Sequence, residues 1–141
     1  MKKENLTEKY LNSWKRERAD FINYKKAEME RIRKAVEYNN EELMLEILLI
    51  LDNIYIAEKN APKDDKWVQG FLKIKEQILS FLKKQGVEEM QCLNKRFDPH
   101  FHEAVEQIET DAASGIIIEE IKKGYLLNSK VLRPAMVKVA K

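Results

Sequence analysis

The sequence predicts an α+β protein in which long paired N-terminal helices and a dimeric four-helix bundle precede a small antiparallel β-domain. Three observations predict this class. Residues 6–36 contain no Gly or Pro and carry apolar residues three and four positions apart, as on one face of an α-helix. Residues 42–82 contain two further apolar helical patterns. Residues 87–141 are rich in β-branched residues, several of which alternate with polar ones, as in strands.

The first expected element is a helix of about thirty residues, which would extend about 45 Å. Its apolar stripe is narrow, so a second helix should cover it, most simply the same helix of another copy. Tyr10, Phe21 and Ile32 are eleven residues apart, a period that favours nearly straight or slightly right-handed pairing. A solvated helix with incidental apolar residues is the alternative. The residues expected to form this dimer contact are Leu11, Trp14, Ile22, Met29 and Ile32.

A second helical pattern follows Asn39 and Asn40. Asn40 could act as the N-cap of a new helix, or the first helix could run straight through. Apolar residues then cover most of the helix surface as far as Asn60, so this segment should be buried on several sides. Pro62 is expected to end it, because proline cannot continue the hydrogen-bonding pattern of a helix.

A third helix should begin at Asp64 or Asp65, either of which can cap it. Gly86 suits the left-handed conformation that often ends a helix. Two buried helices do not close a core by themselves, whereas two copies of the pair make a four-helix bundle. The residues expected at this second dimer contact are Leu43, Ile47, Ile50, Ile54, Phe71, Ile74 and Ile78.

The chain is therefore expected to consist of a long dimerisation helix (1–40), two bundle helices (41–86) and a C-terminal β-domain (87–141). Strands are expected near residues 105–108, 115–121 and 131–139. Residues 127–130 should form a tight hairpin turn, with Asn128 at positive φ. Arg133 precedes Pro134, so we expect a bend or a sheet edge there, with Arg133 on the surface.

Composition excludes several classes of protein. The 26 Lys and Arg against 24 Asp and Glu leave a net charge of +2, which gives no strong indication of nucleic-acid binding. The single cysteine, Cys92, cannot form an internal disulfide and suits a reducing compartment. No apolar run is long enough to span a membrane, and no signal-peptide pattern is present. A cytoplasmic protein without membrane or nucleic-acid partners is expected.

Four segments carry a family resemblance. Residues 97–105 read FDPHFHEAV, residues 124–139 read GYLLNSKVLRPAMVKV, residues 19–26 read ADFINYKK and residues 51–54 read LDNI. They resemble, in the same order, the signatures F-D-P-x-x-H-E-A-V, G-Y-x-L-N-G-R-V-L-R-P-A-x-V-x-V, A-D-F-x-N-Y-K-K and L-D-N-L of the GrpE family. The resemblance extends over nearly the whole chain, and motifs of this length are specific.

The resemblance implies a homodimeric nucleotide exchange factor for an Hsp70 chaperone of the DnaK type, acting in protein folding and the heat-shock response. One β-domain would contact the chaperone's ATPase domain and hold its nucleotide cleft open, so that ADP leaves. A partner that binds the open cleft better than the closed one must weaken nucleotide binding by the same factor. No bond is made or broken, so neither an enzyme nor a cofactor is implied.

The resemblance also implies chaperone-binding residues, each with a plainer alternative. Gly70 could only allow close helix packing, Arg33 and Lys130 could be solvated charges, and the apolar members could belong to the core. The residues are Arg33, Gly70, Phe97, Ile121, Lys130, Arg133 and Val139.

The chain departs from the family pattern at Lys130, with the turn before it, and at Ile56, a further helical position. The usual Asn-Gly turn is Asn128-Ser129 here, and Lys130 stands where the family usually has Arg. Lysine lacks the two-pronged guanidinium, so a carboxylate contact there should be weaker. Ile56 stands where the family often has an Arg, which puts one helical contact with the chaperone in question.

Two other functions remain open. Cys92, His100, His102 and Glu103 include residue types that bind zinc, but no further nucleophile or base lies nearby in sequence, and His102 fits a structural hydrogen bond in the Asp98-Pro99 turn better. No metal is therefore expected. A passive coiled-coil scaffold would explain residues 1–85 but not the motifs of the β-domain.

Overall fold

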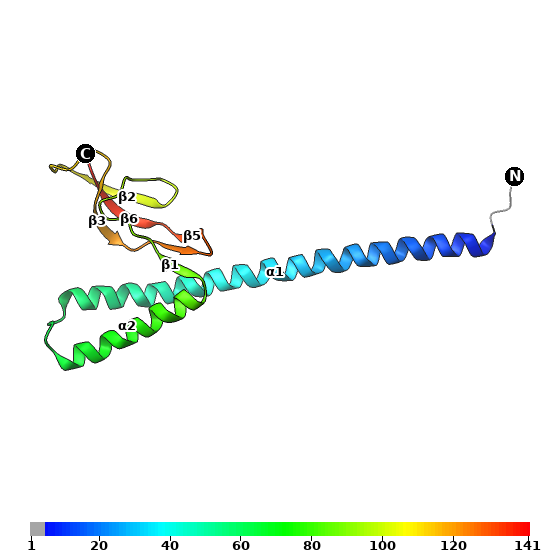
Figure 1. The fold of residues 1–141 in the computed structure, drawn as a ribbon, viewed down its shortest axis with the longest axis horizontal. Helices are drawn as coiled ribbons and strands as arrows, with labels where there is room; N and C mark the ends of the chain where they lie inside the picture. Colours follow the sequence, from blue (N-terminus) through cyan, green and yellow to red (C-terminus); the bar gives the residue numbers. More distant parts are fainter. Residues whose placement is uncertain (1–4) are drawn as a thin grey trace. The chain divides into compact units, whose positions relative to one another are not determined.

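The computed structural model describes residues 5–141 and has the expected α+β class (Figure 1). Two helices, α1 (Leu6–Asn60) and α2 (Lys66–Lys84), come first. The strands follow: β1 (Val87–Glu89), β2 (His102–Ile108), β3 (Ile117–Lys122), β4 (Tyr125–Leu127), β5 (Lys130–Arg133) and β6 (Ala135–Ala140). The chain divides into two compact units, one ending at Asn40 and one from Glu41 to Lys141. Residues 1–4, the start of the expected dimerisation helix, lie outside the described residues.

The first unit is a single stretch of α1. The helix begins after Asn5, whose side-chain oxygen accepts a hydrogen bond from the Thr7 amide at 3.3 Å, and Glu8 lies in the first turn, where a carboxylate is favourable. No side chain between residues 5 and 40 is buried. Although α1 is long, neither it nor α2 is apolar enough over sufficient length to cross a membrane.

The helix does not break at Asn39-Asn40. It continues from Leu6 to Asn60, so the possible N-cap at Asn40 was wrong and the uninterrupted alternative is correct. Asn is only a moderately poor helix former, and no Gly or Pro lies nearby to stop the helix. The helix ends where Pro62 predicted.

The ends of α2 are formed by the residues that the sequence indicated. Asp65 is the N-cap, and its carboxylate accepts a hydrogen bond from the Trp67 amide at 2.8 Å. At the other end, Gly86 has φ of +83°, and its amide donates to the Lys83 carbonyl at 3.1 Å. Both caps satisfy backbone groups that a helix end leaves without partners.

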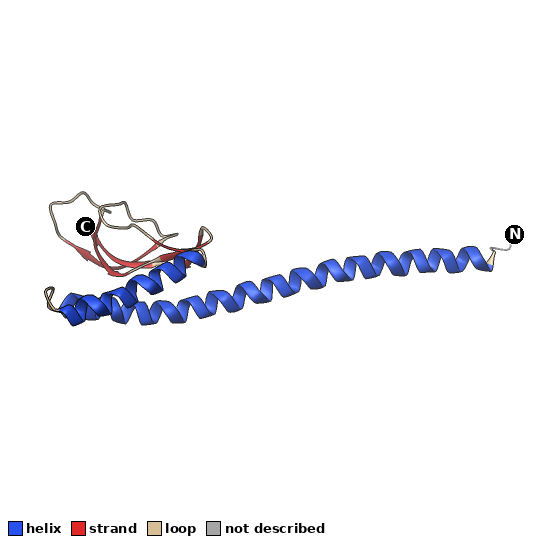
Figure 2. Cartoon of the chain, turned by 60° about the horizontal axis from the view of Figure 1, so that its bottom comes forward, coloured by secondary structure: helices blue, strands red, loops and turns tan. Residues whose placement is uncertain are grey.

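The strands, drawn red in Figure 2, form two sheets. Each sheet has three strands, with orders β1-β4-β5 and β2-β6-β3. Asn128 (φ 48°) and Ser129 (φ 69°) make the predicted hairpin turn between β4 and β5. Pairings β1–β4, β4–β5 and β3–β6 are antiparallel, but β2–β6 is parallel. Alternation of apolar residues does not report strand direction, so the sequence did not predict this parallel pair.

Two hydrophobic clusters form the core of residues 41–141. The first joins both helices to the sheet β1-β4-β5 and contains Met44, Leu48, Leu51, Leu82, Val87 and Tyr125. The second lies in the β-domain and contains Met90, Cys92, Ile117, Ala135, Val137 and Val139. The helices of the second unit therefore share a core with strands.

Candidate functional site

The two helices of the second unit present a common apolar surface, here called the helix-pair seam. It consists of Leu43, Ile47 and Ile50 of α1 with Ile74, Ile78 and Phe81 of α2. Ile50 is 56% exposed and Ile74 is 49% exposed. A hollow of about 330 Å³ lies between the two helices, lined almost entirely by these side chains. Exposed apolar area of this kind is typical of surfaces that contact another protein, a ligand or a membrane.

A second hollow, here called the groove, lies between α1 and the strands β3 and β6. Its volume is about 800 Å³. Its apolar lining consists of Leu49 and Ile56 of α1, Ile121 of β3 and Met136 of β6, and Ile121 is 45% exposed. An α-helix turns about 100° per residue, so Leu49 and Ile56 lie on a different side of α1 from Ile47 and Ile50.

The polar residues of the groove are held by cations of the same chain. Asp52 pairs with Arg133, Glu58 pairs with Lys75 at 2.6 Å, and Glu120 lies 3.4 Å from Lys123. Lys59 and Lys122 also line the groove. An apolar floor with a charged rim is the usual composition of a protein–protein contact.

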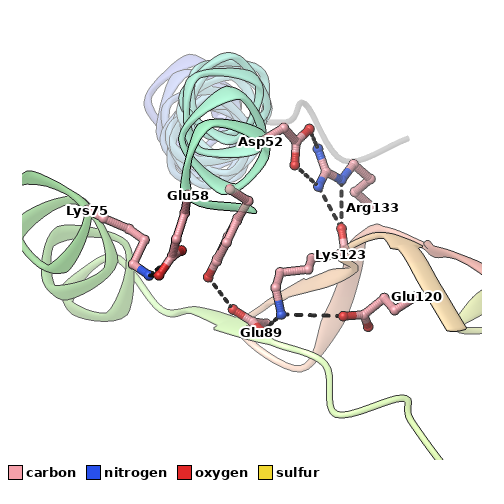
Figure 3. A network of polar contacts seen from close by, with 8 residues as sticks. Asp52, Glu58, Lys75, Glu89, Glu120, Lys123 and Arg133 are labelled. Carbon is pink, nitrogen blue, oxygen red and sulfur yellow. Dashed lines mark hydrogen bonds and ion pairs between the residues drawn. The ribbon is translucent and has the colours of Figure 1, made fainter. Parts of the chain in front are cut away.

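Arg133 forms the centre of a polar network that joins α1 to the strands (Figure 3). Its Nη1 and Nη2 donate to the two oxygens of Asp52 at 2.7 and 2.8 Å. Its Nε and Nη2 also donate to the Lys123 carbonyl at 3.1 and 2.6 Å. The Arg133 side chain is only 13% exposed, so the expected surface position was wrong, because the guanidinium finds its acceptors within the chain.

The network continues from Lys123 to β1 (Figure 3). The Lys123 ammonium pairs with Glu89 of β1, and the Tyr55 hydroxyl of α1 donates to the same carboxylate at 3.0 Å. Burial, followed by the nearby charge of Glu89, raises the pKa of Tyr55 to about 12. Burial is the largest single effect on Lys123 and opposes its charge, but the hydrogen bond to Glu89 and the negative charges of Glu89 and Glu120 together outweigh burial, so the pKa of Lys123 is also raised. Both groups therefore keep their protons at neutral pH.

The two exposed basic residues expected to contact the chaperone, Arg33 and Lys130, belong to different units of the chain. Arg33 is exposed in the first unit, where its Nη2 is 2.7 Å from Glu30 and its Nη1 contacts Glu37; these pairs raise its pKa. Lys130 is exposed in β5, 3.1 Å from Glu41. Both side chains are exposed to solvent, and both pair with acidic residues of the same chain.

Gly70 is exposed in α2, at the margin of the helix-pair seam. A Cβ atom built there would meet nothing within 4 Å. Close packing within this chain is therefore not the reason for a glycine at this position.

The three apolar chaperone-contact residues have different surroundings. Val139 is 4% exposed and belongs to the second cluster, so its side chain is core and offers no surface to a partner. Phe97 is half-buried against the same cluster, and only Ile121 faces the groove. The helical expectation for Ile54 is corrected in the same way. Ile54 is 7% exposed and buried within its own chain.

Several residues of the groove and network escaped sequence reasoning. Leu49 and Ile56 are seven residues apart and so share a helix face, which was a usable signal. Leu49 was instead expected in a segment buried on several sides, and Ile56 was considered only as the residue that stands where the family often has an Arg. The Asp52–Arg133 pair joins residues 81 positions apart, and nothing local to either residue indicates it.

Two of the four residues weighed as a zinc site, His102 and Cys92, are held within the chain. The Nδ1 atom of His102 accepts a hydrogen bond from the Asp98 amide at 2.9 Å, as expected for a structural histidine in this turn. Cys92 is buried, and burial raises the pKa of its thiol to about 11. Within residues 5–141 no three His, Cys, Asp or Glu side chains are grouped so that they could hold a metal ion.

Comparison with known proteins decides the family. The GrpE family model matches residues 1–141. The chain belongs to the GrpE family. It is 39% identical to Protein GrpE of Alkaliphilus oremlandii over 137 residues, which is 95% of this chain and 73% of that protein. It is 37% identical to Protein GrpE of Bacillus velezensis over 138 residues, with 95% and 72% covered. With Protein GrpE of Parageobacillus thermoglucosidasius the identity is 37% over 133 residues, with 92% and 59% covered.

Proposed function

We propose that this GrpE-family chain is a homodimeric nucleotide exchange factor that binds the ATPase domain of a DnaK-type Hsp70 and promotes release of ADP. The proposal extends what the family resemblance implies. The observation that carries it is the presence of two exposed apolar surfaces on different sides of α1, the helix-pair seam and the groove. Because the two surfaces lie on different sides of α1, we assign them to different partners. A second copy of the chain would cover the helix-pair seam, and the chaperone would bind the groove.

The seam supports the dimer. Ile47, Ile50, Ile74 and Ile78 would close against the same residues of a second copy, which makes a four-helix bundle from two helix pairs. The first unit supports the same conclusion, because Leu11, Trp14, Ile22, Met29 and Ile32 find no cover within residues 5–40. We propose residues 1–40 as the long dimerisation helix, 41–86 as the bundle helices and 87–141 as the chaperone-binding β-domain.

The groove supports the chaperone contact. Ile121 is expected at that contact, and it forms one wall of the groove with Met136, opposite Leu49 and Ile56. Ile56 stands where the family often has an Arg, so the contact on this helix is apolar in this chain. We therefore expect the chaperone to insert an apolar side chain between α1 and β3.

The proposed mechanism is thermodynamic linkage. A protein that binds the open nucleotide cleft more tightly than the closed cleft weakens ADP binding by the ratio of the two affinities. The chain supplies only binding energy and shape, and no covalent step occurs. We place this activity in the cytoplasm, with no membrane or nucleic-acid partner.

The direct test is release of fluorescent ADP from a purified DnaK-type ATPase domain, with excess unlabelled nucleotide as the competitor. We expect the full chain to accelerate release in proportion to its concentration until the chaperone is saturated. The alternative is a passive coiled-coil scaffold, which would bind without changing the rate. An unchanged release rate at saturating chain concentration would favour that alternative.

A further inference from the structure

The Asp52–Arg133 pair joins the helices to the β-domain at one point. Both guanidinium nitrogens of the fork engage one carboxylate, at 2.7 and 2.8 Å. This two-bond geometry fixes direction as well as distance. The two side chains are only 13% and 16% exposed, so solvent screens their attraction less than that of a surface pair.

Arg133 lies where the chain passes from one sheet of the β-domain to the other. β5 ends at Arg133 in one sheet, and β6 begins at Ala135 in the other. The same guanidinium donates to the carbonyl of Lys123, which lies between β3 and β4. One side chain therefore connects α1 to two of the three crossings between the sheets, β3 to β4 and β5 to β6.

The position of Asp52 on α1 places the pair next to the groove. Asp52 lines the groove between Leu49 and Ile56, about one helical turn from each. The opposite wall carries Ile121 and Met136. The Asp52–Arg133 pair thus joins α1 to the strands beside the groove, in addition to the first hydrophobic cluster and the Tyr55–Glu89 hydrogen bond.

We propose that Asp52 and Arg133 are positioning residues that hold the β-domain at a fixed angle to α1, so that the groove accepts the open form of the chaperone and rejects the closed form. This inference rests on the proposed function. It also assigns Arg133 a role other than touching the chaperone. If α1 and the strands could move relative to each other, the groove would fit the open and the closed chaperone equally well. A protein that binds two states with equal affinity does not shift the equilibrium between them.

The experiment compares the full chain with Asp52→Asn, Arg133→Met and the double variant. The dissociation constant is measured for the nucleotide-free and the ADP-loaded ATPase domain. Each single substitution should lower the ratio of these affinities about tenfold, while affinity for the ADP-loaded form changes less than about twofold. The double variant should lose no more than either single one, because the two residues act as a unit. Arg133→Lys keeps the positive charge but lacks the two-pronged guanidinium, so its affinity ratio should lie between those of the wild-type chain and Arg133→Met.

The matched control is Lys138→Met. Lys138 lies 3.2 Å from Glu106 and 3.4 Å from Glu119, an ion-pair cluster that stays within the β-domain and does not reach α1. In this variant the ratio of affinities for the nucleotide-free and the ADP-loaded ATPase domain should stay at the wild-type value. Residual dipolar couplings provide a second readout. One alignment tensor should fit residues 41–60 and the strands of the wild-type chain, whereas the pair variants should need two.

The outcomes separate this inference from the proposed function. If the wild-type chain leaves ADP release unchanged, the proposed function fails. If the wild-type chain accelerates release but the pair variants keep its affinity ratio and only unfold at lower temperature, the pair merely stabilises the fold. If Arg133→Met lowers the ratio but Asp52→Asn does not, Arg133 contacts the chaperone directly. Either of the last two results overturns the positioning role alone.

Discussion

Residues 5–40 and residues 41–141 use similar apolar residues in opposite ways. In the first stretch Trp14, Phe21 and Met29 are all more than half exposed, and no side chain is buried. In the second stretch Leu48 and Leu51 are fully buried. Both stretches contribute to α1, so helix formation alone does not distinguish them.

The difference shows where each stretch obtains its stability. Most helical stability in proteins comes from packing of an apolar face, and an isolated helix is marginal in water. Residues 41–141 have such packing within the chain, whereas residues 5–40 would have to obtain it from another chain. The following predictions test this contrast, from the largest effect to the smallest.

Leu48→Ala should cause the largest loss. Leu48 is fully buried in the first cluster, so the free energy of unfolding should fall by about 2–5 kcal/mol. Met29→Ala lies in the same helix at a side chain that is 71% exposed. It should leave the unfolding of residues 41–141 unchanged. Urea denaturation, followed by near-ultraviolet and far-ultraviolet circular dichroism, measures both. A loss below about 1 kcal/mol for Leu48→Ala would contradict the core assignment.

Ile50→Asp should separate the dimer. A carboxylate at the helix-pair seam would lose its hydration on association, so the dimer dissociation constant should rise about a hundredfold. Ser80→Asp, also an exposed position of the helix pair but away from the seam, is the control and should associate normally. Sedimentation equilibrium measures the constant. If both variants remain equally dimeric, the seam is not the dimer contact.

Ile121→Asp should weaken chaperone binding without loss of stability. Ile121 is 45% exposed and lines the groove, so a charge there should reduce affinity for the ATPase domain about tenfold. Val105→Asp is matched in exposure, at 44% on β2, but lies outside the groove and should bind as the wild-type chain does. Surface plasmon resonance gives the affinities, and thermal unfolding verifies that both variants are folded. Equal losses from the two substitutions would place the contact elsewhere.

Gly70→Ala should have the smallest effect. The position has open space within the chain, and a glycine inside a helix costs roughly 0.5–1 kcal/mol relative to alanine. The free energy of unfolding should rise by about that amount in urea titrations. Gly70→Asp, which adds a charge at the seam margin, should instead weaken chaperone binding or disturb the four-helix bundle. A loss of stability in Gly70→Ala would show that a second chain packs closely against this position.

Local signals in the sequence predicted local structure well. Asp65 and Gly86 cap α2 as expected, Pro62 follows the end of α1, and Asn128 takes positive φ in the hairpin turn. Each of these depends on the conformational preferences of a few neighbouring residues. The helical apolar patterns were equally clear, although they did not reveal that α1 continues through Asn39-Asn40.

Long-range features could not be predicted in the same way. The bidentate pair of Asp52 with Arg133 and the parallel pairing of β2 with β6 depend on how distant segments meet. The same limit explains why the expectations for Arg133 and Val139 were wrong. A charge before a proline suggested exposure of Arg133 and a family motif suggested a contact at Val139, but tertiary packing leaves Arg133 only 13% exposed and buries Val139. The groove was only partly foreseen, because Ile121 was expected at a binding surface while Leu49 was not.

The order of the sheet β2-β6-β3 has a consequence for how the protein is made. β2 and β3 do not pair with each other, since β6 lies between them and supplies the bonding partners of both. A ribosome completes β2 and β3 first, and they must wait with unpaired edges until the residues of β6 emerge. The second hydrophobic cluster, which takes Ala135, Val137 and Val139 from β6, therefore cannot form during most of synthesis. A chain stalled before Ala135 would expose two strands ready to pair with other polypeptides.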